Sequence, residues 1–322
     1  MIRAAIAGYG GIGKSVERAI NNSGDMELAA IFTRRPNDAA NATAPLISMD
    51  EAAAWAERVD VLILCGGSFA DLPVQGPELA KHFHTVDSFD THPDIPQYFA
   101  TMDKALKASG KLGLISAGWD PGLFSLNRLY MSAALPDGES CTFWGRGISQ
   151  GHSNAIRQIE GVADAVQYTC PIKNAVQKVR SGAMPRLTPR EKHERECYVV
   201  LKEGADAAYV EKEIINMPYY FADNNTRVHF ISREELAENH SCTATEGFVF
   251  RSGRTGNGNV HHMDYSLKLD SNPEFTAQVM VACARAVSKM AAEGKTGAIT
   301  VLDVPPALLS AKSGEQLRLE LL

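Results

Sequence analysis

The sequence lacks an excess of basic residues, and this absence excludes several classes of partner. It contains 32 Lys and Arg against 38 Asp and Glu, which gives a formal net charge of −6. Proteins that bind nucleic acid or anionic membranes need a basic surface that attracts phosphate groups. We therefore expect a small-molecule substrate as partner, with no role for nucleic acid or a membrane.

Paired cysteines and long apolar runs are also missing. The cysteines are Cys65, Cys141, Cys170, Cys197, Cys242 and Cys283, and no two form a C-x-x-C pair. Scattered thiols fit a reducing compartment better than a disulfide framework, and they offer no zinc-binding pattern. No stretch approaches the roughly 20 apolar residues of a membrane span, and the apolar Met1–Ala7 runs into Gly8 without room for a secretory signal. We expect a cytoplasmic protein without a bound metal.

The chain is long enough and apolar enough for about two domains, with 322 residues and a hydrophobic fraction of 45%. Short apolar runs at 2–7 and 27–32 flank a helical pattern at 14–22, which predicts a βαβ unit. Further buried strands are predicted at 60–65, 84–87 and 111–116. Residues 1–118 should therefore form a Rossmann-type α/β domain with a doubly wound parallel sheet.

Residues 119–272 have a different pattern and predict an α+β domain for substrate binding and dimerisation. Its expected strands are 140–144, 165–169, 196–201 and 226–231, and the Gly-rich residues 253–259 are expected to form a loop. Asn272-Pro273 then predicts the start of a long apolar helix. We expect this helix and the rest of 273–322 to pack back on the first domain.

A glycine-rich segment, Gly8-Tyr9-Gly10-Gly11-Ile12-Gly13, stands between the first strand and the first helix. In the G-x-G-x-x-G pattern Gly8 permits a tight turn, Gly10 lets the backbone approach a pyrophosphate, and Gly13 lets helix and strand pack closely. Amide groups at the helix start then face the phosphates. The alternative is a tight β-to-α turn without a ligand.

The residues after the second strand indicate which dinucleotide is bound. An NAD enzyme usually has Asp or Glu there for the ribose 2′-hydroxyl, whereas this chain has Thr33-Arg34-Arg35. A hydroxyl and two guanidinium groups suit the 2′-phosphate of NADP, although two solvated arginines on a loop are the simpler alternative. Cys65-Gly66-Gly67-Ser68, after a later strand, is a candidate wall of the same crevice or an ordinary loop.

Aspartates cluster at the ends of two further strands. Asp87 and Asp90 follow one of them, and Asp120 lies in Gly118-Trp119-Asp120-Pro121-Gly122. A carboxylate there can hold an ammonium group. Trp144, His152, Thr169 and Arg195 follow in the second domain, where each alone has a structural explanation such as core packing.

Taken in order, these segments resemble the meso-diaminopimelate dehydrogenase family over nearly the whole chain. The segments that carry the resemblance are GYGGIG, IFTRR, TVDSFDTH, SAGWDPG, FWGRGISQGHS, AVQYT, RECYVV, LKLDSNPEFTA and GAITVLDV. The resemblance implies a cytoplasmic bacterial homodimer that uses NADP to oxidise meso-2,6-diaminopimelate at its D centre. The products are L-2-amino-6-oxopimelate, the open form of tetrahydrodipicolinate, and ammonia. The reaction is reversible and belongs to lysine and peptidoglycan precursor synthesis.

The resemblance also implies roles for individual residues at the two ends of the substrate. Asp90 and Asp120 meet the D-centre amine. Because the amine must lose a proton as the imine forms, either aspartate is also a candidate acceptor, directly or through water. The neighbours implied at that end are Trp119, Trp144 and His152, with His152 a further candidate relay. The residues implied at the distal L centre are Thr169, Arg195 and Asn272.

One segment departs from the family pattern. Where the family has Met-Pro-His-Gly-Gly, whose His helps to bind the distal end, this chain has Thr243-Ala244-Thr245-Glu246-Gly247. Thr245 takes the place of the His, and only a local slip in the alignment would bring His240 there instead. Two other functions therefore stay open. One is a dehydrogenase with broader use of D-amino acids, and the other is a non-catalytic NADP-sensing regulator.

Overall fold

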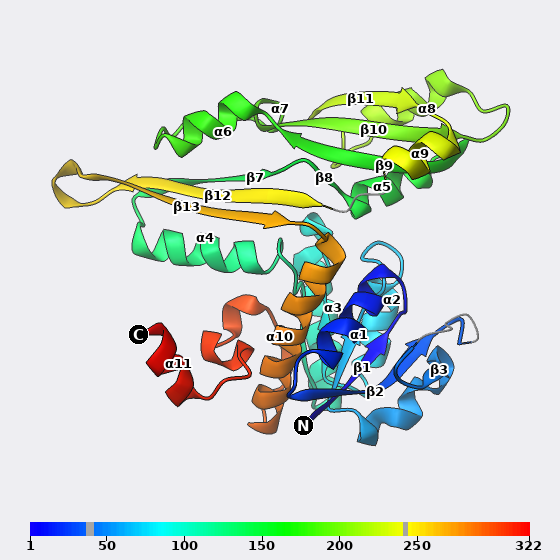
Figure 1. Cartoon of the computed structure of the whole chain (residues 1–322), viewed down its shortest axis with the longest axis vertical. Helices are drawn as coiled ribbons and strands as arrows, with labels where there is room; N and C mark the ends of the chain where they lie inside the picture. Colours follow the sequence, from blue (N-terminus) through cyan, green and yellow to red (C-terminus); the bar gives the residue numbers. More distant parts are fainter. Residues whose placement is uncertain (37–41, 241–243) are drawn as a thin grey trace. The chain divides into compact units, whose positions relative to one another are not determined.

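The computed structural model describes residues 1–36, 42–240 and 244–322 (Figure 1). Cys242 and Thr243 lie outside the described residues. The chain forms two compact units. Unit 1 contains Met1–Leu126 and Pro273–Leu322, and unit 2 contains Asn127–Asn272. Residues just after the predicted boundary at 118 stay with unit 1, since Leu123 N–H donates to Gly118 O and Trp119 packs edge-on against Phe124.

Unit 1 is built on a seven-stranded parallel sheet. The strand order is β14-β6-β5-β4-β1-β2-β3. The chain adds strands on one side of β1, to β3, and then on its other side, from β4 onward, as in doubly wound folds. Each short apolar run becomes a buried strand because both faces of the sheet are covered. The strands are β1 (Ile2–Ala7), β2 (Met26–Thr33), β3 (Leu46–Ser48), β4 (Val61–Leu64), β5 (Thr85–Asp87), β6 (Leu112–Leu114) and β14 (Gly297–Ile299).

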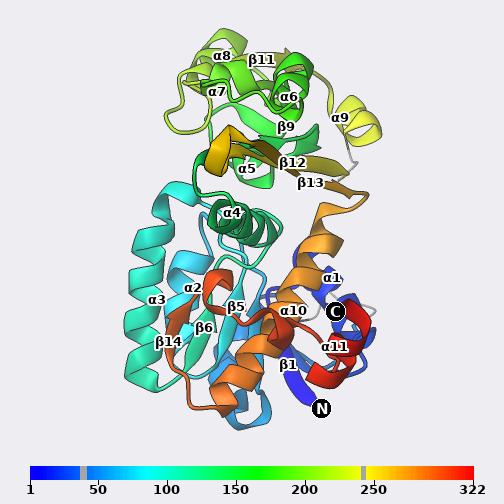
Figure 2. The same ribbon diagram turned by 90° about the vertical axis from the view of Figure 1, so that its left-hand side faces the viewer.

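Helices cover the two faces of this sheet, and the period of two along each strand divides the core accordingly. Ala4 and Ile6 of β1 pack in one core with α1 and α10, while Ala5 and Ala7 pack in another with η1, α2 and α3. Figure 2 shows the helices along the strands. The helices of unit 1 are α1 (Gly11–Asn21), η1 (Met49–Arg58), α2 (Leu72–Leu79), η2 (His92–Asp94), α3 (Ile95–Ser109), α10 (Asn272–Ala292), η4 (Val301–Asp303), η5 (Pro306–Leu309) and α11 (Gly314–Leu321), and α4 (Leu123–Ala134) starts there.

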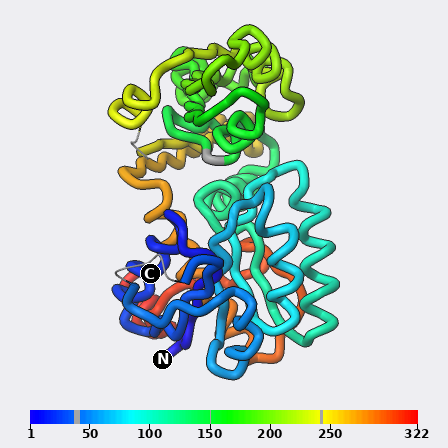
Figure 3. The backbone as a smooth tube through the Cα atoms, turned by 90° about the vertical axis from the view of Figure 1, so that its right-hand side faces the viewer, coloured from blue at the N-terminus to red at the C-terminus, as the bar shows by residue number. Residues whose placement is uncertain are grey.

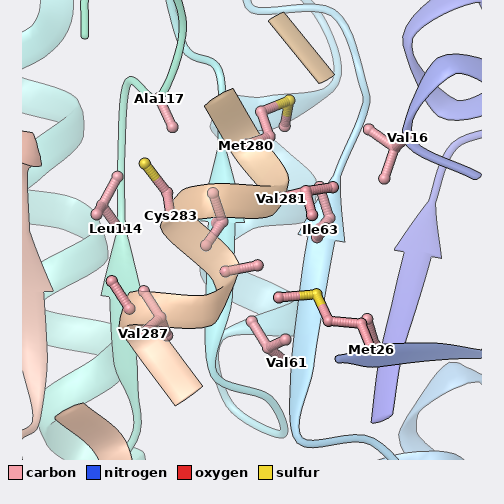
Figure 4. Close-up of a cluster of buried hydrophobic side chains, with 14 of the residues drawn as sticks. Val16, Met26, Val61, Ile63, Leu114, Ala117, Met280, Val281, Cys283 and Val287 are labelled. Carbon is pink, nitrogen blue, oxygen red and sulfur yellow. The ribbon is translucent and has the colours of Figure 1, made fainter. Parts of the chain in front are cut away.

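The late helix α10 packs against the sheet of unit 1, as the sequence predicts. Figure 4 shows Val281, Cys283 and Val287 of α10 beside strand residues such as Ile63 and Leu114. β14 then adds a strand beside β6. Both termini of the chain therefore belong to unit 1 (Figure 3).

Unit 2 contains two smaller sheets. One has the order β11-β10-β9-β8 and the other β13-β12-β7. The strands are β7 (Gly138–Trp144), β8 (Gly147–Ile148), β9 (Val162–Pro171), β10 (His193–Leu201), β11 (Asn225–Phe230), β12 (Thr245–Arg254) and β13 (Val260–Leu269). The helices are α5 (Gln150–Arg157), α6 (Lys173–Arg180), α7 (Pro189–Lys192), α8 (Ala207–Ile215), α9 (Arg233–Asn239) and η3 (Gly256–Gly258).

The hairpin of β12 and β13 differs from the sequence prediction. Residues 253–259 were expected to form a loop, but Gly253 and Arg254 belong to β12, and only the remainder forms the turn. A Cβ added to Gly253 would lie 2.2 Å from Asp137 O. This glycine is therefore required by close strand packing, not by a flexible loop.

No helix in the part of the chain that the structure describes is long and apolar enough to cross a membrane.

Candidate active site

The glycine-rich segment forms the turn between β1 and α1. Gly8 has φ of +97°, a conformation that favours glycine. A Cβ added to Gly13 would lie 2.1 Å from Gly8 O, so only glycine permits this contact of helix and strand. At Gly10 and Gly11 an added Cβ would meet no described atom within 4 Å. The turn thus leaves open space at the start of α1, where backbone N–H groups are available to phosphates.

Tyr9, inside the same turn, is held by a buried carboxylate. Its hydroxyl donates to Glu17 on α1, and Glu17 also accepts from Thr43 N–H at 2.6 Å. Burial and this hydrogen bond raise the pKa of Tyr9 to about 12. One carboxylate thus connects the glycine-rich turn to the chain that follows β2, while Ile12 packs partly buried against the core.

The three residues at the end of β2 have different environments. Thr33 is buried, and its hydroxyl accepts a hydrogen bond from Arg35 N–H at 3.2 Å, so it shapes the turn. Arg34 and Arg35 are exposed. Arg34 pairs with Asp71 at 3.2 Å, from the loop that follows β4. Of the described residues that directly follow β2, none is a carboxylate, and the acidic group at Arg34 comes from Asp71 of a different loop.

The Cys65–Ser68 loop continues from β4 beside the glycine-rich turn. Cys65 N–H donates to Ala7 O at 2.8 Å, and an added Cβ at Gly8 would lie 3.3 Å from the Cys65 carbonyl carbon. Asp71 accepts from Gly67 N–H at 3.0 Å and leaves room only for glycine at Gly66, where a Cβ would lie 2.7 Å from the Asp71 Cβ. The carboxylate that holds Arg34 therefore also shapes this loop.

Asp90 and Asp120 follow neighbouring strands of the same sheet, β5 and β6. Because the carboxyl ends of parallel strands meet at one edge, unit 1 gathers both aspartates, the Cys65–Ser68 loop and the glycine-rich turn there. Asp90 is exposed, Asp120 is half-buried, and Asp90 N–H donates to Ser68 Oγ at 3.1 Å. Both carboxylates are accessible to a ligand, with the half-buried Trp119 beside Asp120.

Asp87 does not share this accessibility. It is 0% exposed and accepts hydrogen bonds from Phe89 N–H, Ser116 N–H and the Tyr98 hydroxyl. Burial raises the pKa of Asp87 to about 6, while the three hydrogen bonds that it accepts act in the opposite direction. The expectation that a carboxylate at this edge holds an ammonium group therefore does not apply to Asp87.

In unit 2, Thr169 and Arg195 face each other across β9 and β10. Both are buried, and Arg195 Nη1 donates to Thr169 Oγ1. Burial lowers the pKa of Arg195 to about 10, so it stays cationic at neutral pH. Among the described residues its Nε has no hydrogen-bond partner and no carboxylate pairs with it. A buried guanidinium without an anion is costly, which is typical of a site that receives an anionic ligand.

Thr245 lies next to this pair. β8 pairs with β9 so that Gly147 is opposite Thr169, and a Cβ added to Gly147 would lie 1.9 Å from Thr245 Oγ1. His240 lies elsewhere, because its ring contacts Tyr168 and Tyr198. These tyrosines alternate with the site residues along β9 and β10, and so point to the other face of the sheet. The structure therefore brings Thr245, and not His240, to the neighbourhood of Arg195.

Trp144 and His152 are positioned by hydrogen bonds within unit 2. Trp144 N–H donates to His193 Nε2 at 3.0 Å, and burial lowers the pKa of His193 to about 3, so this imidazole is neutral. His152 Nδ1 lies 2.6 Å from Ser149 Oγ, near the start of α5, the helix that packs on β9. Asn272 is half-buried where α10 begins.

Three buried or half-buried residues of these sites have no sequence signal of their own. Glu17 falls at an ordinary helical position, and Gln167 falls at an ordinary strand position beside Thr169. Gln167 is 0% exposed and its Oε1 has no partner among the described residues. Asp71 precedes Leu72-Pro73, a pattern that predicts a helix start but not a contact with Arg34. Only the tertiary structure places them.

Comparison with known proteins gives one consistent result. Residues 118–271 match the family model described as "Diaminopimelic acid dehydrogenase C-terminal domain". The chain is 55% identical to a meso-diaminopimelate D-dehydrogenase of Lysinibacillus sphaericus, over 100% of this chain and 99% of that protein.

Solved structures of the same kind are similar over the full length. A C. glutamicum DAP dehydrogenase in complex with DAP is 42% identical with a TM-score of 0.95, covering 100% of this chain and 99% of that one. An engineered D-amino acid dehydrogenase bound to NADP+ is 41% identical with a TM-score of 0.93 and the same coverage. The similarity therefore includes both units.

Proposed function

Because this chain belongs to the meso-diaminopimelate D-dehydrogenase family, we propose that it oxidises meso-diaminopimelate at the D centre with NADP, giving L-2-amino-6-oxopimelate and ammonia. The enzyme is an oxidoreductase that acts on a CH–NH2 group. The observation that carries the substrate assignment is the buried Arg195 beside Thr169, with which no carboxylate of the described residues pairs. A receptor of this kind suits the carboxylate of a distal centre, which simple D-amino acids lack.

The residues of unit 1 fit NADP. The open space at Gly10 and Gly11 accommodates a pyrophosphate at the start of α1, and Arg34 and Arg35 suit the 2′-phosphate. The remaining residues proposed for this site are Gly8, Tyr9, Ile12, Gly13, Thr33, Cys65, Gly66, Gly67 and Ser68. NADP, when bound, supplies the hydride acceptor for the D-centre Cα.

The carboxylates of Asp90 and Asp120 hold the D-centre amine in this proposal. An ammonium group must lose a proton before the C–N bond becomes an imine, and an accessible carboxylate is a suitable acceptor, directly or through water. Water then adds to the imine carbon, its oxygen becomes the keto oxygen, and the nitrogen leaves as ammonia. Trp119, Trp144 and His152 shape this end of the substrate.

The distal L centre is held by Arg195 and Thr169, with Thr245 and Asn272. A guanidinium binds a carboxylate through two parallel hydrogen bonds, which fixes its orientation as well as its position. Residues 1–118 serve the dinucleotide, 119–272 serve the substrate and dimer formation, and 273–322 complete the first domain. The protein acts as a homodimer in the cytoplasm.

A substrate panel tests the proposal. NADPH formation by the purified full chain is measured with the meso, L,L and D,D isomers of diaminopimelate and with simple D-amino acids. We expect turnover of the meso isomer and none of the L,L isomer, which has no D centre. Similar kcat/KM values for simple D-amino acids would favour a broader D-amino acid dehydrogenase. No turnover with any amino acid would favour an NADP-sensing regulator.

Thr245→His is expected to improve the reaction of meso-diaminopimelate selectively. Thr245 has a short neutral side chain, so its contact with the distal centre is weaker than that of a His. A hydrogen bond to a charged group is worth roughly 1.5–3 kcal/mol, so kcat/KM should rise by about ten- to a hundredfold. The rise should be absent for simple D-amino acids, and the KM for NADP should not change.

The control for this substitution is Thr255→His, at an exposed position of the hairpin. It should leave all constants unchanged. A Thr245→His variant that is folded but neutral or impaired would mean that another group already binds the distal end. The close approach of Gly147 to Thr245 makes a stability measurement part of this test.

A further inference from the structure

The buried carboxylate of Asp87 lies where two loops begin, the loop after β5 that carries Asp90 and the loop after β6 that carries Asp120. It ends β5, and all its hydrogen-bond donors are neutral. Oδ1 accepts from Phe89 N–H and from Ser116 N–H, each at 3.0 Å, while Oδ2 accepts from the Tyr98 hydroxyl at 2.9 Å. A fully buried carboxylate is costly to keep. Its three specific hydrogen bonds indicate what it does at this position.

The hydrogen bonds that Asp87 accepts from Phe89 N–H and Ser116 N–H each fix one of these two loops. Phe89 directly precedes Asp90, and Ser116 opens the segment that leads to Asp120. The Asp87 carbonyl oxygen adds a second link, because Ala117 N–H donates to it at 2.7 Å. One residue thus bonds to both loops at once.

Ser116 needs this support because its backbone is strained. It has φ of +62°, in the left-handed region, and it is not a glycine. Such a conformation is unfavourable for a residue with a Cβ and persists only where surrounding contacts fix it. The Asp87 bonds to Ser116 and Ala117 are contacts of this kind.

Tyr98 of α3 holds the carboxylate from the other side. Its ring stacks on Phe89 with centroids 4.1 Å apart, and its hydroxyl donates to Oδ2. Phe89 is therefore held through both its N–H group and its ring. The orientation of Asp87 is determined by the helix as well as by the strands.

We propose that Asp87 is a positioning residue that sets the placement of Asp90 and Asp120 relative to each other. The inference depends on the proposed function only for the identity of the amine that the two aspartates hold. Asp87 itself does not touch substrate. Its substitution should therefore affect the amine substrate and leave the dinucleotide unaffected.

The test compares Asp87→Ala, Asp87→Asn and the parent. A misplacement of about 1 Å can lower the rate by about 10²-fold, so Asp87→Ala should reduce kcat by ten- to a hundredfold with an unchanged KM for NADP. Asp87→Asn keeps an oxygen that accepts from both backbone N–H groups, and it should recover most of the loss. Unchanged kcat in a folded Asp87→Ala variant, or a loss that appears equally in the KM for NADP, overturns the proposal.

The matched control is Asp60→Asn, since Asp60 is also a carboxylate that accepts from a backbone N–H, that of Arg3 at 2.8 Å. It lies just before β4, at the opposite edge of the same sheet. Loss of this carboxylate should lower stability without changing kcat or either KM. If Asp87→Ala does not fold, Tyr98→Phe takes its place, with a reduction of kcat by a few-fold, and an unchanged kcat overturns the proposal.

A readout without turnover separates this inference from the proposed function. Amide hydrogen exchange of residues 88–90 and 116–120 should become faster in Asp87→Ala or Tyr98→Phe than in the parent, in Asp87→Asn and in Asp60→Asn. Unchanged protection of both segments overturns the positioning role even in a protein that oxidises diaminopimelate. Faster exchange in a protein with no turnover supports the positioning role and counts against the proposed function alone.

Discussion

Replacing Arg195 with Met is expected to lower kcat/KM for meso-diaminopimelate by about 10²- to 10⁴-fold, since two hydrogen bonds to a carboxylate are worth roughly 1.5–3 kcal/mol each. The loss should be much smaller for a simple D-amino acid, which has no distal carboxylate. The KM for NADP should not change. Steady-state kinetics with both substrates provide the measurement.

The stability of this variant distinguishes a binding role from a structural one. Arg195 is buried, and no carboxylate in the part of the chain that the structure describes pairs with it, so Met removes a buried charge while it fills a similar volume. Substitutions of this kind are often neutral or stabilising, and we expect a melting temperature equal to or above that of the parent. Arg227→Met, at an exposed site on β11, is the control. A marked fall in melting temperature together with equal losses for both substrates would show that Arg195 is structural.

The double substitution of Arg34 and Arg35 by Ala is expected to weaken NADP binding by about 10²- to 10⁴-fold. The 2′-phosphate loses two charged hydrogen-bond donors worth roughly 1.5–3 kcal/mol each. NAD, which has no such phosphate, should be affected little. Loss of Arg34 also frees Asp71 from its ion pair, and a carboxylate there suits a ribose hydroxyl. The ratio of kcat/KM values for the two dinucleotides is the measured quantity.

The single variants add a second result, because the two side chains bind one phosphate and their effects should not be additive. Arg18→Ala is the control, since Arg18 is an exposed arginine of α1 that pairs with Glu274. It should leave the dinucleotide ratio unchanged. Equal use of NADP and NAD by the unmodified protein would contradict the assignment of Arg34 and Arg35.

The sequence predicts β1, β2, β4, β5 and β6 of unit 1 because both faces of this sheet are covered, but it misses the three-residue strands β3 and β14. Strands such as Val61–Leu64 are short, uniformly apolar runs, and these stand out from the helices between them. β13 (Val260–Leu269) is different. It is largely exposed, but Met263, Tyr265, Leu267 and Leu269 alternate with polar residues, which is the pattern of a strand with one covered face. The sequence therefore carries a signal for β13 that the expected strands leave out.

The residues of the candidate site also differ in whether the sequence alone can group them. Residues at the ends of parallel strands, such as Asp90 and Asp120, can be grouped from the sequence, since the sheet brings those ends to one edge. The resemblance to a family contributes Arg195 and Thr169. Contacts across loops cannot be derived in this way, and so the pairing of Arg34 with Asp71 and the burial of Asp87 emerge only from the folded chain.

The position of α10 and β14 near the end of the sequence has a consequence for folding during synthesis on the ribosome. Residues 1–126 emerge first, yet the apolar face that contains Ile63 and Leu114 is covered by a helix translated only after the whole of unit 2. The nascent chain therefore presents an uncovered apolar surface during that interval, and chaperones bind surfaces of this kind. A circular permutant that begins at Pro273 would translate α10 and β14 before β1, and unit 1 would then be a continuous segment that folds as it is made.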